Sequence, residues 1–401
     1  MRNAGYGAQA QANIHPDDFH NDAEASPKQP VSRQIPQDSF KKEHILQSLK
    51  ERSLGGLVRE LMLQMLWRSS AVFSTTHVGA GQLVKKFTKV ANEYILDEAA
   101  AATIPEAAQI WRNDRPLILG GDPFQLLPAT LSAGTKYQGT DHTINPLAPQ
   151  HKLSLLRLAM LNGWPCLVLR YQRRMVLGLF DLFGVGCVLE HHPAARRCED
   201  WVVRKLDVRA SPNGRVLPVF VHVRNSEVRF ADISRSRSNP RMLQVLIRVL
   251  NRLIQGARLD PNQIAIITPY TAQENAILQA VGHRLISVSD NPKKMLLTTA
   301  DRSQGNERDV VIFLLVNTRQ SDSGLLWDEN RMNVISTRAR DFMIVIGDIG
   351  VDQKTPSANV KLASGRVSGE NKLPQWLRFF QDHGRVANMS GSQKTLLQRG
   401  L

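Results

Sequence analysis

Short apolar runs bounded by small, acidic or amide residues recur along most of this chain. Buried parallel strands have this pattern, because both faces of such a sheet are covered and successive residues need not alternate in polarity. Polar residues follow several of the runs directly, at the position where ligand groups lie in open α/β sheets. The pattern predicts strands over 71–75, 93–96, 116–119, 217–223, 264–267, 295–298, 310–316 and 342–346.

Apolar residues spaced three and four apart predict helices among these strands. The stretch 39–68 has this spacing, with Gly55-Gly56 as a break. Further helices are expected over 242–254, 272–281 and 375–381. A chain of 401 residues with alternating strands and helices predicts an α/β fold in two domains, since domains cluster near ~100–200 residues each.

Composition predicts a disordered leader, a basic carboxyl-terminal tail and a negatively charged binding partner. Residues 1–38 are rich in Asn, Gln, Ala, Asp, His and Pro without an apolar period, so we expect a disordered leader. Residues 351–401 are expected to form a basic tail around one short helix. The formal charge of +15 and a pI near 10.0 favour nucleic acid as a partner. A well-solvated basic surface is the alternative explanation of the same charge.

Cysteine content and hydropathy indicate the cellular compartment. Cys166, Cys187 and Cys198 are too few and too irregularly spaced for a disulfide framework or a C-x-x-C zinc site. The amino terminus has no secretory signal pattern, and no uninterrupted apolar run approaches ~18 residues. We therefore expect a protein of the cytoplasm or nucleus, with no membrane partner.

Two motifs that follow neighbouring strands indicate a phosphate-handling site. Asp97-Glu98 is suited to hold Mg²⁺ through water and to orient an attacking water. The same acidic pair would also suit the positive end of a helix dipole. Gln125, after the Gly120-Gly121-Asp122 turn, can hydrogen-bond a phosphate oxygen or a water, although a plain turn explains the glycines equally.

The order of the motifs resembles superfamily 1 helicases of the group that includes the nonsense-mediated-decay RNA helicase, over about Ala71 to Asp348. This chain has Arg173 where the family has a tyrosine, and Ala300 and Ser303 where it has valine and phenylalanine. The matching segments are Thr75-Thr76-His77-Val78-Gly79-Ala80-Gly81, Asp97-Glu98-Ala99, Gly121-Asp122-Pro123-Phe124-Gln125-Leu126, Gln172-Arg173-Arg174-Met175, Thr268-Pro269-Tyr270 with Gln273, 299–309 and 331–339.

This resemblance implies two RecA-like, P-loop NTPase-type parallel-sheet domains, a partial one at 39–168 and a second at 169–350, which use ATP and Mg²⁺ on single-stranded RNA or DNA. The implied site residues are Asp97, Glu98, Gln125, Arg174 and Arg338 for catalysis, Gln304, Gly305 and Glu307 for the nucleotide, Asp97 for the metal through water, and Thr75, Thr76, Thr268, Pro269, Tyr270 and Thr299 for nucleic acid. Arg331, Arg340, Asp301 and Asp309 are better explained as structural anchors and braces.

One family element is missing from these 401 residues. The phosphate-cradling loop Gly-x-x-x-x-Gly-Lys-Ser/Thr does not occur, and the dipeptide Gly-Lys is absent. We therefore expect an incomplete first domain and weak or absent autonomous ATP hydrolysis. Three interpretations stay open: an ATP-dependent helicase or translocase, a non-catalytic helicase-like protein that binds nucleic acid or a protein, and a fragment of a longer helicase.

Overall fold

The computed structural model describes two units of the chain, which divide between Val72 and Phe73. The second unit contains all the strands of the described residues. The described residues are 54–73, 91–111, 115–129, 137, 140, 142–169, 171–183, 190–191, 215–232, 236–288, 291, 293–321, 324–352 and 372–388.

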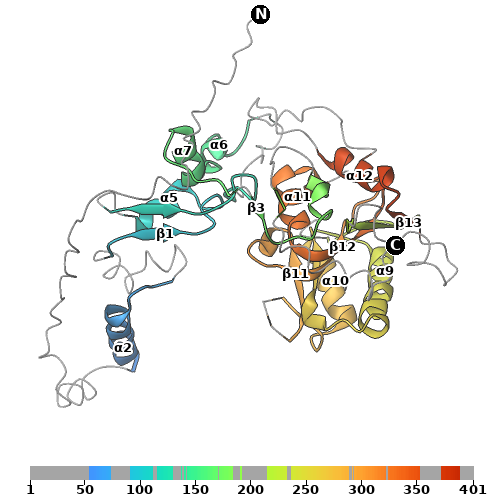
Figure 1. Ribbon diagram of the computed structural model, residues 1–401, viewed down its shortest axis with the longest axis horizontal. Helices are drawn as coiled ribbons and strands as arrows, with labels where there is room; N and C mark the ends of the chain where they lie inside the picture. The colour runs from blue at the N-terminus through green and yellow to red at the C-terminus, as the bar shows by residue number, and fades with distance from the viewer. Residues whose placement is uncertain are drawn as a thin grey trace, which may run out of the picture. The chain divides into compact units, whose positions relative to one another are not determined.

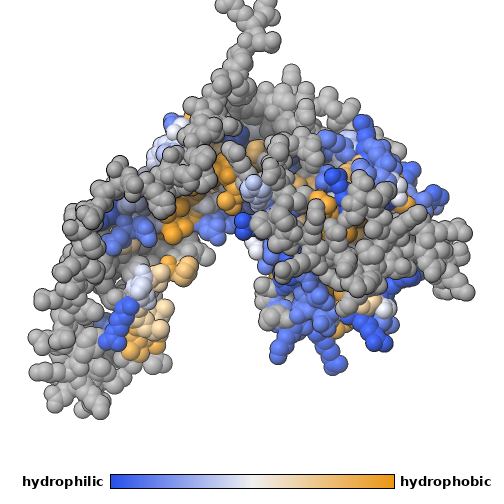
Figure 2. Space-filling model, in the orientation of Figure 1, coloured by the Kyte–Doolittle hydropathy of each residue, from blue (hydrophilic) through white to orange (hydrophobic). Residues whose placement is uncertain are grey.

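Helix α2 (Leu54–Arg68) is the described element of the first unit. It includes Gly55 and Gly56, so the expected break at these glycines is wrong: both lie in its first turn, where glycine costs less helix stability than in the interior. Its exposed side chains are partly apolar, and Figure 2 shows them in orange along the helix. They are Val58, Leu61, Met62 and Met65.

A seven-stranded parallel sheet forms the centre of the second unit, with strand order β13-β5-β12-β11-β8-β10-β9. Its middle strands are buried on both faces, as the apolar runs predict. The α/β fold with a large parallel sheet is thus confirmed. The strands are β5 (Val219–His222), β8 (Ile264–Thr268), β9 (Ile286–Ser287), β10 (Met295–Thr299), β11 (Arg308–Leu314), β12 (Ala339–Gly347) and β13 (Val386–Asn388).

Helices cover both faces of this sheet (Figure 1). The connections β5 to β8 and β8 to β10 cross the sheet in one direction, whereas β11 to β12 and β12 to β13 cross it in the other. Because such crossovers are right-handed, the first two helices lie on one face and the last two on the opposite face. They are α9 (Pro240–Asn251), α10 (Thr271–Val281), α11 (Glu329–Ser336) and α12 (Leu373–Asp382).

Helix ends carry the capping residues that the sequence supplies. Asn239 begins α9, and its side chain accepts a hydrogen bond from Met242 N at 3.1 Å. Asp328 does the same for the first turn of α11. Gly282 ends α10 with a φ of 87°, a conformation that glycine adopts without strain.

A smaller parallel pair, β1 (Tyr94–Leu96) and β2 (Leu117–Leu119), stands apart from the large sheet in hydrogen bonding. Helices α5 (Ile104–Ile110), α6 (Ala148–His151) and α7 (Leu155–Leu161) accompany it. Leu96, Ala99 and Leu156 belong to its core. Ile95 and Ile118 are exposed, at 67% and 53%, and Figure 2 shows apolar surface over these strands.

The remaining elements are short. They are the parallel pair β3 (Tyr171–Gln172) and β4 (Glu190–His191), the antiparallel pair β6 (Arg229–Phe230) and β7 (Arg237–Ser238), the 3-10 turns at Phe180–Phe183, Pro261–Gln263, Asp301–Ser303 and Gly324–Trp327, and a π-helical turn at Arg252–Gly256. None of the helices in the described ranges has the length and apolar content needed to cross a bilayer.

Two further expectations fail in the described residues. Residues 71–73 are not in a strand, although a strand was expected over 71–75. The short helix expected over 375–381 is present as α12, but residues 372–388 are part of the fold and not of a basic tail, because β13 pairs with β5 in the large sheet. The physical reason is burial, since Trp376 and Phe380 of α12 are 5% and 0% exposed and make edge-to-face contact with each other.

Candidate functional site

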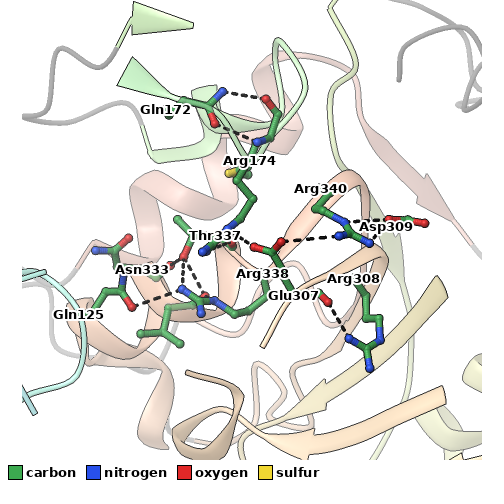
Figure 3. Close-up of polar contacts among 12 residues, drawn as sticks. Gln125, Gln172, Arg174, Glu307, Arg308, Asp309, Asn333, Thr337, Arg338 and Arg340 are labelled. Carbon is green, nitrogen blue, oxygen red and sulfur yellow. Dashed lines mark hydrogen bonds and ion pairs between the residues drawn. The ribbon is translucent and has the colours of Figure 1, made fainter. Parts of the chain in front are cut away.

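Arg338, between α11 and β12, is the most buried cation of the motif residues at 2% exposure (Figure 3). Its Nε donates to the carbonyl oxygen of Val334 at 2.8 Å, and its Nη2 donates to Thr337 Oγ1 at 3.0 Å and Gln125 Oε1 at 3.3 Å. All three acceptors are uncharged. Burial, followed by the nearby positive charge of Arg174, lowers the pKa of Arg338 from its ordinary value to about 10.

Arg174 reaches the same place from the turn after β3. Gln172 fixes this turn by donating to the carbonyl oxygen of Met175 at 2.7 Å and accepting from its N–H at 2.9 Å. The Arg174 guanidinium donates to the carbonyl oxygen of Thr337 at 3.1 Å and forms an ion pair with Glu307. The two guanidiniums that the sequence predicts to face one phosphate are therefore brought together.

Glu307 is shared between two arginines at the start of β11 (Figure 3). Besides Arg174, its carboxylate lies 3.6 Å from Arg340 Nη1, and Arg340 Nε donates to Asp309 at 2.8 Å. These contacts hold Arg340 and Asp309 as strand anchors. Arg331 similarly donates to Asp301 at 2.7 Å.

Three hydrogen bonds connect the segment around β1 and β2 with the large sheet. Gln304 Nε2 donates to Glu98 Oε2 at 2.7 Å, and Arg338 donates to Gln125 as above. Asn333 Nδ2 donates to the carbonyl oxygen of Phe124 at 2.8 Å, a contact that the sequence did not predict, although Asn333 lies inside a matched motif. Residues 206 to 213 positions apart thus converge on one site.

A cavity of about 1380 Å³ opens beside these groups. Gln125, Arg174, Asn333 and Thr337 contribute polar atoms to its wall. Aromatic side chains line it as well, a composition that suits a ligand with both a flat apolar part and charged groups. They are Phe124, Tyr171, Phe180, Trp376 and Phe379.

The acidic pair after β1 is the place where the sequence predicts a Mg²⁺ site. The described residues contain no group of three or more His, Cys, Asp or Glu side chains that could hold a metal ion. Asp97 is exposed, whereas Glu98 has its Oε2 engaged by Gln304. Because Mg²⁺ prefers oxygen ligands and keeps several waters, Asp97 fits a water-rich Mg²⁺ site.

The residues predicted to contact nucleic acid lie at the opposite edge of the sheet. Thr268 and Thr299 end the neighbouring strands β8 and β10 and are register partners. Pro269, Thr268 and Tyr270 are buried, so only Thr299 of this group is partly accessible. Tyr270 Oη accepts a hydrogen bond from Asn317 at 3.1 Å. Thr75 and Thr76 lie outside the described residues.

Gly305, predicted to contact the nucleotide, has a φ of 79°, with no atom within 4 Å of the position that a Cβ would take.

Comparison with known proteins gives a consistent picture. A family model described as an AAA domain matches residues 151–350. The regulator of nonsense transcripts 1 homolog of Drosophila melanogaster is 27% identical over 76% of this chain and 24% of its own length. The ATP-dependent helicase NAM7 of Saccharomyces cerevisiae is 26% identical over 73% and 28%, and the DNA polymerase alpha-associated DNA helicase A of that yeast is 34% identical over 27% and 15%. The chain spans less than a third of the length of these relatives.

Proposed function

We propose, from the premise that the chain belongs to the superfamily 1 helicases of the nonsense-mediated-decay type, that it binds single-stranded nucleic acid and carries the receiving side of an ATP site. The observation that carries the proposal is Arg338, a buried guanidinium with hydrogen bonds to uncharged oxygens. A phosphate group placed beside it would supply a negatively charged hydrogen-bond acceptor, which its present acceptors are not.

The residues around Arg338 fit the needs of phosphoryl transfer, which depends mainly on positioning and charge stabilisation. Arg174 and Arg338 would neutralise developing negative charge. Gln125 can hold a water or a phosphate oxygen through its side-chain amide, and the Glu98 carboxylate can accept a proton from an attacking water once it separates from Gln304. Mg²⁺, when held by Asp97, would supply charge neutralisation of the phosphates.

Single-stranded RNA or DNA is the proposed partner at the carboxyl edge of the sheet. The net charge of +15 favours it, and the relatives include a regulator of nonsense transcripts 1 homolog and a DNA polymerase alpha-associated DNA helicase. Because Thr268 and Tyr270 are buried, the strand would rest mainly on side chains around them.

A non-catalytic role is the second candidate, and one observation favours it. Glu98 is bound to Gln304 and Arg174 is paired with Glu307, so two of the proposed catalytic groups have partners within the chain. The polypeptide of 401 residues also contains no Gly-Lys dipeptide. We therefore expect ATP binding with little turnover from this polypeptide.

Nucleotide binding and turnover separate the candidates. We expect ATP with Mg²⁺ to raise the thermal unfolding temperature of the chain, and Arg338→Gln to remove most of that rise. ATP hydrolysis stimulated by a single-stranded oligonucleotide and abolished in Arg338→Gln would refute the non-catalytic role. No thermal response to ATP, together with no binding of oligonucleotide, would refute the main proposal.

A further inference from the structure

A second cavity, of about 350 Å³, lies at the carboxyl ends of β5 and β12. All of its lining residues are polar or charged. Four of the lining side chains are more than nine-tenths buried, which distinguishes the cavity from an ordinary surface depression. The lining includes His222, Arg224, Ser226, Thr318, Arg319 and Asp348.

The topology of the sheet creates this cavity. After β5 the chain turns to the face that carries α9, and after the neighbouring β12 it turns toward α12 on the opposite face. A crevice forms where adjacent parallel strands send their connections to opposite faces, and ligands of open α/β sheets bind in such crevices. The neighbouring strands β8 and β11 also send their connections to opposite faces, with α10 on one face and α11 on the other.

The cavity carries a net positive charge. Arg319 donates to Asp348 with its N–H and Nε, at 2.9 and 3.1 Å, and with Nη2 at 3.0 Å. Although burial alone would raise the pKa of Asp348, the hydrogen bonds from Arg319 and Gly350 hold it below its ordinary value. Asp348 is therefore ionised and matched by Arg319, which leaves the Arg224 charge in excess.

The other lining groups can donate hydrogen bonds. His222 Nδ1 accepts from the Ile349 N–H at 3.2 Å, so its ring proton lies on Nε2. Burial lowers the pKa of His222, which keeps the ring neutral near pH 7. Ser226 Oγ accepts from Asn239 at 3.2 Å, which leaves the hydroxyl hydrogen available for donation.

Asn225 places two of these groups. Its φ of 51° is left-handed, a conformation that asparagine tolerates better than most residues. The bend occurs directly between Arg224 and Ser226. Both side chains line the cavity, and Arg224 also contacts Asn388 Oδ1 at 3.4 Å.

We propose that this cavity is a phosphate-binding site, with Arg224 as its principal cation and the neutral donors around it completing the coordination. The phosphate would come from the backbone of the single strand at the carboxyl edge, and this source rests on the proposed function. Thr318 connects the cavity to Asn317 and hence to Tyr270, so one strand would continue from β8 and β10 past β12.

Two binding assays on the complete chain test the proposal. The first is fluorescence anisotropy with a fluorescein-labelled single-stranded oligonucleotide at several salt concentrations. The second is thermal unfolding with inorganic phosphate. The variants are Arg224→Gln, Arg224→Lys and, as a matched control, Arg258→Gln, which removes an exposed arginine at the amino end of β8. Thr318→Val tests the site without changing its charge.

We expect Arg224→Gln to weaken oligonucleotide binding about fivefold and to reduce the salt slope by about one. Arg224→Lys should restore part of the affinity, and Arg258→Gln should leave it unchanged. If oligonucleotide binding is unaffected but Arg224→Gln and Thr318→Val abolish stabilisation by phosphate, the site stands and its ligand is a separate small phosphate compound. The proposal is overturned if neither assay responds to these variants. A wild-type chain that binds no oligonucleotide would refute the proposed function, whereas the phosphate assay would still decide the cavity.

Discussion

Arg338 offers a sharp test of the site, because replacing a buried charge with an apolar side chain should stabilise this fold. Arg338→Met preserves much of the side-chain volume and removes the charge. The guanidinium is 2% exposed, and its described hydrogen bonds go to Val334, Thr337 and Gln125, all through uncharged oxygens. Val334 keeps partners in the variant, since its carbonyl oxygen also accepts from Thr337.

The magnitude follows from the pKa. Burial in the fold lowers the pKa of Arg338 to about 10, well below the ordinary value of an arginine. At about 1.4 kcal/mol per pKa unit, the charged form is destabilised by about 3 kcal/mol in the fold. Loss of the hydrogen bonds offsets part of the gain, so we expect Arg338→Met to be more stable by about 1–2 kcal/mol. The thermal midpoint should rise by about 2–4 °C per kcal/mol.

Thermal unfolding with and without ATP checks this reasoning, with Arg331→Met as the matched control. Arg331 is also largely buried but is paired with Asp301 at 2.7 Å and Asp328 at 3.3 Å, so its loss should lower the midpoint. ATP should stabilise the wild type and not Arg338→Met. If Arg338→Met lowers the midpoint as much as Arg331→Met does, the guanidinium is a structural anchor and the argument fails.

Three further outcomes are expected. Gly324→Ala should destabilise the second unit by about 2 kcal/mol or more, because its φ is 54° and an added Cβ would lie 2.1 Å from Tyr270 Oη; urea denaturation that matches the wild type would contradict this. Asn239→Ala should cost about 2 kcal/mol in the same assay, because it removes a helix cap and buried hydrogen bonds to Ser226 and Val316; Asn251→Ala, at the exposed end of α9, is the control. Burial lowers the pKa of His222 below 6.5, so the unfolded chain takes up the proton first and stability should fall as pH drops from 6.5; His222→Asn should flatten that slope, and an unchanged slope would assign it to other groups.

The sequence was sufficient to predict the central strands. Both faces of the sheet are covered, so each of these strands is an uninterrupted apolar run with buried residues such as Ile266, Ile312 and Ile344. The end of the sheet was missed. β13 is three residues long, and α12 has apolar residues among polar ones in a basic region. Whether such a segment packs depends on tertiary partners such as Phe313, which contacts Trp376, and the local pattern does not encode them.

The candidate site was predictable as a set of motifs but not as a set of contacts. Gln304 and Glu98 are 206 positions apart, so their hydrogen bond depends on tertiary structure. The burial of Arg338 and Thr268 could not be predicted either, because each is a polar residue at or next to the end of a strand, where burial depends on tertiary packing. The polar cavity at β5 and β12 was not predicted, since its residues come from three separate loops and lie outside the segments that match the helicase motifs.

The two proposed binding regions are connected by the same two strands. Arg338 directly precedes β12 and Asp348 directly follows it, while Glu307 and Thr318 lie before and after β11. A strand of nine residues extends about 30 Å. Both strands are paired along their length and almost wholly buried, so they can shift as a unit more easily than they can bend.

An anion that draws Arg338 toward the cleft would therefore act on Asp348 and Arg319 at the far end. Reciprocity requires that a phosphate bound there alter the affinity for nucleotide by the same factor. Arg224→Gln should then remove the effect of oligonucleotide on nucleotide affinity without changing nucleotide affinity in its absence.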